Sequence, residues 1–132
     1  MVILGILAAF AIPRFISLEG DARTASIKAL GGALQGSNAL AHSLALVNSQ
    51  TGATGSVNMD GADVDLVFGY PDATGDGIGN SVSITSDYDA VYAGGVGTYT
   101  LDGYTGSPCS VVYTQAADSA TPSTILITTT GC

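Results

Sequence analysis

The side chains that could carry chemistry are concentrated in two places. The only cysteines are Cys109 and Cys132, the latter being the last residue, and the run Asp72–Asn80 places oxygen-bearing side chains on alternate residues. Two cysteines near a chain end are typical of a disulfide in an exported protein. The alternative is a pair of reduced cysteines in a cytosolic protein. A redox-active pair is disfavoured because Cys-x-x-Cys spacing is absent.

The aspartate-rich run suggests a calcium loop. Asp72, Thr74 and Asp76, followed by glycine, imitate the opening of such a loop, and Asn80 would add an oxygen. Serine stands at position 83, where an EF-hand-like loop needs a bidentate glutamate. The competing interpretation is an Asp/Gly turn between strands. Calcium at these four residues is therefore a hypothesis, and no other cofactor is expected.

The remaining polar groups do not indicate an enzyme. Asp60, Asp63 and Asp65 suit solvated turns and sheet edges, where charge discourages edge pairing. The enzymatic alternative is a pair of glycosidase-type carboxylates. His42 is the only histidine, and it fits a polar position on a helix. Because no nucleophile elbow or phosphate-cradling loop is present, we predict that the protein is not an enzyme.

Charge divides the chain into two parts. The net charge of the 132 residues is −8, and the only cations are Arg14, Arg23 and Lys28. Nine aspartates follow residue 28 without a single basic residue. Clustered cations are needed to bind nucleic-acid phosphates, so a nucleic-acid partner is disfavoured. The acidic part must also repel copies of itself unless salt screens it.

The positioning elements start with a long helix. Residues 1–13 carry no polar side chain, fewer than the roughly 20 apolar residues of a membrane span. A cleaved signal peptide is the alternative for this stretch, although its first charge, Arg14, follows the apolar run. From Phe15 to about Asn48 the spacing is helical. The periodic residues are Phe15, Leu18, Ala22, Ala25, Ala29, Ala33, Leu40, Leu44 and Val47, with an adjoining row of Ile27, Leu30, Leu34 and Ala41. We expect one helix over residues 1–50, with a kink near Pro13.

The remainder, residues 51–132, has the pattern of a β-rich head. Short β-prone runs alternate with Gly, Asp and Pro. The predicted strands are Asp63–Phe68, Ser81–Thr85, Thr98–Leu101, Ser110–Thr114 and Thr124–Thr130. One helix followed by strands predicts an α+β fold. A 109–132 disulfide loop would tether the C-terminal strand to this head.

These residues resemble a known family. Residues 2–15, the stretch Leu18-Glu-Gly-Asp-Ala-Arg23, the Gly69-Tyr70-Pro71 step and the closing residues 128–132 are similar to type IV pilins, especially the mannose-sensitive haemagglutinin group. The match is strong over roughly the first 50 residues and diffuse afterwards. Family members begin, after processing, with a methylated Phe-Thr-Leu-Ile-Glu, whereas this sequence opens with Met1 inside the apolar run. No residue here is assigned the role of that glutamate.

The resemblance implies a long N-terminal helix packed on a small antiparallel β-sheet head, and a function as the major subunit of a bacterial surface filament used in adhesion or motility. Subunits would wait in the inner membrane with the pilus assembly machinery, then polymerise with copies of themselves; Ser- and Thr-rich loops could carry O-glycans. Residues 1–28 would form the filament core or membrane part. The core-packing residues would be Ile3, Leu4, Ile6, Leu7, Phe10, Ile12, Phe15 and Leu18. The helix would lose hydrogen bonds between Gly5 and Pro13 in the filament.

Two alternatives remain at this point. A pseudopilin of type II secretion shares the N-terminal signature, and family pseudopilins often bind calcium, whereas the terminal cysteine pair favours a pilin. An exported carbohydrate-binding β domain with a cleaved signal is the alternative from another class.

Overall fold

The chain forms one long helix followed by two antiparallel sheets. The computed structural model describes the backbone from Val2 to Cys132 and the side chains from Leu18 onward. Helix α1 (Val2–Val47) precedes β1 (Gly55–Met59), β2 (Ala62–Val67) and β3 (Tyr70–Pro71). A short π-helical segment, η1 (Gly75–Gly79), leads to β4 (Tyr88–Ala93), β5 (Val96–Leu101), β6 (Ser110–Thr114) and β7 (Thr124–Thr128). The α+β prediction is confirmed, with two small sheets in the head.

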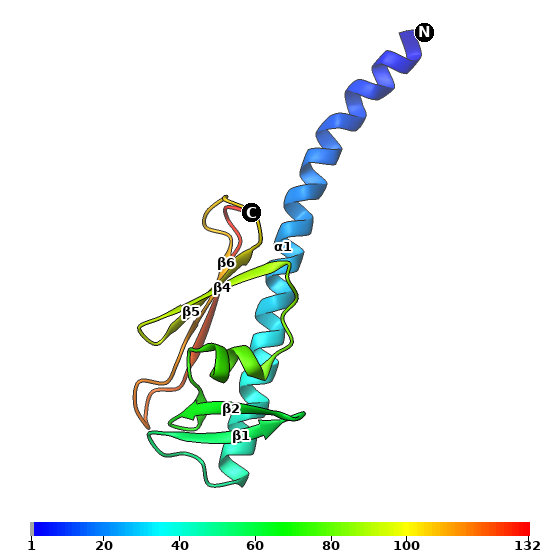
Figure 1. Ribbon diagram of the computed structural model, residues 1–132. Coiled ribbons are helices and arrows are strands. Elements are labelled where there is room, and N and C mark those ends of the chain that lie inside the picture. The colour runs from blue at the N-terminus through cyan, green and yellow to red at the C-terminus, as the bar shows by residue number, and fades with distance from the viewer. Residues whose placement is uncertain (1) are drawn as a thin grey trace.

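Within each sheet, every strand pairs with its neighbours in the chain. The first sheet has the order β1-β2-β3 and the second the order β4-β5-β6-β7, and every described pair is antiparallel. Asp60 and Gly61, both with positive φ, make the two-residue turn between β1 and β2, the geometry that matches strand twist. Figure 1 shows both sheets beside the C-terminal part of α1, while the N-terminal part, drawn in blue, extends away from them.

The sequence predicted β2, β5, β6 and β7 to within a few residues, but the strand over Ser81–Thr85 was wrong. That segment follows η1 without pairing, because Val82 and Ile84 pack against the core as single side chains. Strands β1, β3 and β4 were missed. β4 carries exposed residues at three consecutive positions, Asp89, Ala90 and Val91, and so lacks the alternation that identifies a half-buried strand.

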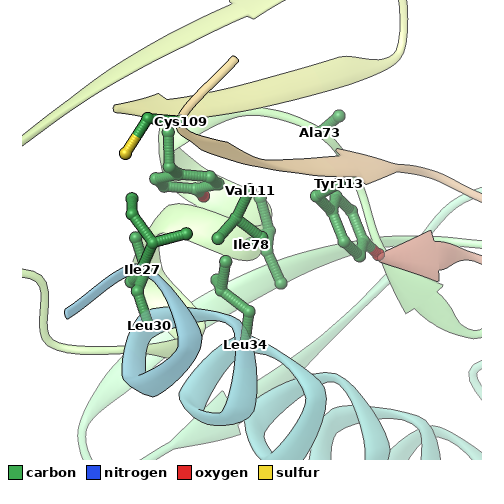
Figure 2. Close-up of a cluster of buried hydrophobic side chains, with 9 residues drawn as sticks. Ile27, Leu30, Leu34, Ala73, Ile78, Cys109, Val111 and Tyr113 are labelled. Atoms are coloured by element: carbon green, nitrogen blue, oxygen red, sulfur yellow. The ribbon is translucent and has the colours of Figure 1, made fainter. Parts of the chain in front are cut away.

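The core is divided between the two sheets. Ile27, Leu30 and Leu34 of α1 pack against the four-stranded sheet with Ile78, Tyr99, Val111 and Tyr113, and Figure 2 shows the helix side chains pointing toward Val111 and Ile78. Further along the helix, Ala41 and Ala45 pack against Val57, Val64 and Leu66 of the three-stranded sheet. Each sheet is therefore anchored to a different stretch of the same helix.

Glycine 31 explains how the helix approaches β7 so closely. A Cβ at this position would lie 2.3 Å from Cδ1 of Ile127, well inside van der Waals contact. Considered by itself, the Gly31-Gly32 pair would weaken the helix, by about 1 kcal/mol per glycine relative to alanine. The structure gives Gly31 a packing reason, because the missing side chain makes room for the sheet.

Candidate functional site

The two cysteines close the C-terminal part of the head. Cys109 and Cys132 form a disulfide across a sequence separation of 23 residues, as predicted. Cys109 precedes β6 and is almost fully buried. The backbone N–H of Gly131 donates to the carbonyl of Pro108 at 2.8 Å. The disulfide therefore holds residues 129–132 beside the start of β6.

This closed loop is also attached to the helix, through Arg23 and Tyr104. The Arg23 Nε donates to the Cys132 carbonyl at 2.8 Å, and its guanidinium carbon lies 4.4 Å from the centre of the Tyr104 ring. The Tyr104 hydroxyl donates to the carbonyls of Gly131 and Cys132, at 2.6 and 3.1 Å. We call Arg23, Tyr104, Gly131 and Cys132 the C-terminal lock. The Glu19 carboxylate, 3.9 Å from Arg23, adds an exposed ion pair of little energetic weight.

Helix α1 has a second apolar face that the head does not cover. The adjoining row predicted from the sequence, Ile27, Leu30, Leu34 and Ala41, is the one that the sheets bury. The main periodic row lies largely on the opposite side. Its exposed members are Leu18, Ala22, Ala25, Ala29, Ala33, Leu40 and Val47, which we call the free face. Leu18 is 62% exposed and Leu40 54%, whereas Leu44 packs partly against the core.

The predicted packing residues before Leu18, namely Ile3, Leu4, Ile6, Leu7, Phe10, Ile12 and Phe15, lie outside the side chains that the structure describes. The predicted loss of hydrogen bonds between Gly5 and Pro13 concerns the filament and stays a prediction. Over the residues searched, no helix combines the length and apolar character required to cross a bilayer.

The Asp72–Asn80 run folds as a capped turn. Thr74 is the N-cap of η1, accepting from the Gly77 N–H at 3.0 Å while its own hydroxyl donates to Asp72. The Asn80 amide donates to the carbonyl of Asp63. These contacts bring Asp72 and Thr74 together. Both residues are among the four proposed calcium ligands, and both already form hydrogen bonds that stabilise the turn. No cluster of three His, Cys, Asp or Glu side chains forms among the described residues. Calcium binding at this turn stays a prediction.

The other acidic group follows the β1–β2 hairpin. Asp60 lies in the turn, and Asp63 and Asp65 point to solvent from β2. Asp63 accepts a hydrogen bond from the Asn58 amide at 3.0 Å. The solvated turn expected from the sequence is found at Asp60, whereas Asp63 and Asp65 are solvent-exposed on β2, the central strand of its sheet rather than an edge strand.

A groove beside His42 was not foreseen. The His42 ring stacks on Tyr70 with ring centres 4.0 Å apart, and Nδ1 lies 2.8 Å from the Gly69 carbonyl. The groove has a volume of about 450 Å³ and is also lined by Leu46, Phe68 and the 119–122 loop. The Ala120 N–H donates to Asp118, which lowers the pKa of that carboxyl and shapes the loop. No local signal pairs a histidine in a helix with a tyrosine 28 residues later, so sequence reasoning could not find this groove.

Buried tyrosines form hydrogen bonds between the two sheets and within the larger one. The Tyr113 hydroxyl donates to the Pro71 carbonyl at 2.6 Å, joining the two sheets, and the Tyr99 hydroxyl bonds to that of Tyr92 at 3.1 Å. Burial raises the pKa of Tyr99 far above its ordinary value of 10.0, with a further contribution from Tyr92. Burial also raises the pKa of Tyr113. Both groups are structural, because each is buried and paired within the protein.

Comparison of the chain with protein-family models, with curated proteins and with solved structures found no match.

Proposed function

We propose that the protein is the structural subunit of a bacterial surface filament of the type IV pilus kind, assembling with copies of itself through helix α1. The observation that carries the proposal is the free face of α1. A helix that is apolar on two sides is stable in a setting where both sides are covered. The head covers one side, so a second copy is the natural partner for the other.

The composition of the free face supports a helical partner. Four of its seven members are alanines, at positions 22, 25, 29 and 33, and small side chains let two helices approach closely. The helix has 46 residues and so a length of about 69 Å. Its N-terminal part extends beyond both sheets in Figure 1, where it is available to helices of other copies.

The charge distribution supports the same arrangement. The cations lie within the first 28 residues and nine aspartates lie after them. Heads of like charge repel, so the attraction between copies must come mainly from the helices. Burial of apolar helix surface contributes about 25 cal/mol per Å² wherever water is the alternative. The acidic head then faces solvent, with its C-terminal end held by the C-terminal lock.

The proposal is tested by electron microscopy of the full-length protein after removal of detergent. Ordered filaments are expected for the wild type. The double variant Ala25→Glu/Ala29→Glu should form none, because buried unpaired charges on the free face oppose helix packing. Ala53→Glu, in an exposed head loop, is the matched control and should assemble. Thermal unfolding checks that all three heads are folded. Single particles of the wild type under every condition would refute the proposal.

The groove beside His42 favours a second candidate, the carbohydrate-binding domain. Aromatic rings offer an apolar surface to the face of a sugar, and the lining includes Phe68, Tyr70 and the hydroxyls of Thr51 and Ser119. Calorimetric titration with neutral oligosaccharides tests it. Heat that is lost in Tyr70→Ala would support this candidate, and absence of heat at millimolar sugar would eliminate it.

A further inference from the structure

The outward face of the four-stranded sheet has an ordered pattern of side chains. The pairing registers align Val91, Thr98, Val112 and Leu126 in one row across β4, β5, β6 and β7. Val91 and Leu126, at the two ends of this row, are 66% and 63% exposed. The rows on either side consist of Thr, Ser, Val and Ala, with Asp89 at one corner. We call the twelve outward positions of these three rows the outer sheet face.

The outer sheet face is almost free of charge in a strongly acidic protein. Asp89 is its only charged residue, so eight of the nine aspartates that follow residue 28 lie elsewhere in the chain. Since no cation follows residue 28, two heads cannot attract one another by pairing Asp with Lys or Arg. They can approach with least repulsion where both surfaces are neutral. The charge distribution therefore selects the same face of a second copy as its partner.

The orientation of the sheet makes this face available in a filament. Its opposite side packs against α1 through Tyr99, Val111 and Tyr113. If α1 lies innermost, as proposed above, the outer sheet face points away from the filament axis. Two neighbouring filaments would then present the same face to each other many times over.

The size of the face explains why such a contact would be weak alone. Four strands spaced about 4.8 Å apart, with five or six residues each, cover about 350 Å². Two such faces bury about 700 Å², below the roughly 1,200 Å² of a stable complex. Repetition along a filament turns a weak contact into a strong one, because each contact raises the effective concentration for the next.

We propose that the outer sheet face is a lateral contact surface, through which copies in neighbouring filaments pack sheet to sheet and gather the filaments into bundles. This inference rests on the proposed filament function. The row from Val91 to Leu126 forms the apolar centre of the contact, and the flanking Thr and Ser side chains surround it. Salt strengthens the contact, since it screens the repulsion between the acidic surfaces around the neutral faces.

The test measures bundling of filaments assembled from the full-length protein, by low-speed sedimentation and electron microscopy. Val91→Asp/Leu126→Asp should still form single filaments. The sedimented fraction should fall by at least about fivefold, because the weakening of one contact is repeated at every contact along the filament. Ala53→Asp adds the same kind of charge outside the outer sheet face and should bundle like the wild type. Val91→Thr/Leu126→Thr keeps strand-forming residues in the row and should reduce bundling with little risk to folding.

Mixing filaments of two oppositely charged variants is a further test, and a general loss of stability would not produce its expected result. Filaments of Val91→Lys/Leu126→Lys should not bundle alone, yet they should bundle with the Asp variant, because either orientation of two facing rows then opposes Lys to Asp. If filaments of every variant bundled like those of the wild type, the inference would be overturned and the filament function would remain intact. Absence of wild-type filaments would refute the filament function, and the inference would fall with it.

Discussion

The two sides of helix α1 differ in side-chain size. The buried side presents Ile27, Leu30 and Leu34 to the larger sheet, whereas alanines make up most of the free face. Large branched side chains fill the volume between a helix and a sheet, and small ones allow a close approach between helices. The buried side therefore stabilises the head on the helix, and the free face is the side through which the proposed assembly would contact a neighbour. This difference can be tested by changing each side separately.

Truncation on the buried side should have the largest effect. Leu34 is fully buried, so Leu34→Ala should lower the free energy of unfolding by about 4 kcal/mol through lost burial and a cavity. Leu40→Ala, on the free face, should cost less than about 1 kcal/mol in the isolated subunit, because the side chain is already 54% exposed. Urea unfolding of the monomeric protein in detergent measures both. Equal losses would contradict the assignment of the two sides.

Removal of the disulfide should have the second-largest effect on the free energy of unfolding. Cys109→Ser/Cys132→Ser opens a loop of 24 residues, counted inclusively from the separation of 23, and should cost about 3 kcal/mol. The loss should be local to the four-stranded sheet. Hydrogen exchange is therefore expected to quicken in β6 and β7 more than in β1 and β2, which are anchored separately on Ala41 and Ala45. Uniform quickening in both sheets would show that the two parts of the core unfold as one unit.

The C-terminal lock should contribute less to the free energy of unfolding than the disulfide does. Arg23→Ala removes a hydrogen bond to the Cys132 carbonyl and the contact with the Tyr104 ring, and should cost about 1–2 kcal/mol. Arg23→Lys keeps the charge without the planar Nε donor, so it should lose most of the same free energy. Thermal unfolding compares the three proteins. Wild-type stability in the lysine variant would mean that charge alone, rather than the geometry of the lock, is responsible.

The last predicted effect is a pH dependence of stability caused by Tyr99, and it is confined to alkaline solution. The pKa of Tyr99 is raised in the folded protein, so its contribution is complete below the unfolded value of 10.0. Above that pH the unfolded chain loses its proton first, and stability falls as pH rises. Denaturant unfolding from pH 8 to 11 should show this decline, and Tyr99→Phe should make it shallower. An unchanged slope in the variant would exclude Tyr99 as the source.

Local sequence predicted those elements whose signals are local. The helix over residues 15–48, the strands β5, β6 and β7 and the disulfide follow from periodicity, β-prone runs and cysteine placement. The Ser81–Thr85 prediction failed because Val and Ile alternate there for packing rather than for pairing. The His42 groove and the C-terminal lock could not be predicted, because each joins residues more than 25 positions apart.

The amino-acid order alone determined that this protein has an apolar start, a helix with two apolar rows and an acidic, cysteine-closed, β-rich end, because these properties are read from neighbouring residues. Tertiary structure alone decided which row the sheets cover. Both rows have helical spacing, so spacing does not distinguish them. The sheets cover the row that contains Ile27 and Leu34, because its large side chains fill the volume between the helix and the strands. The same packing aligned Val91 with Leu126, since register across four strands depends on contacts that no single segment contains.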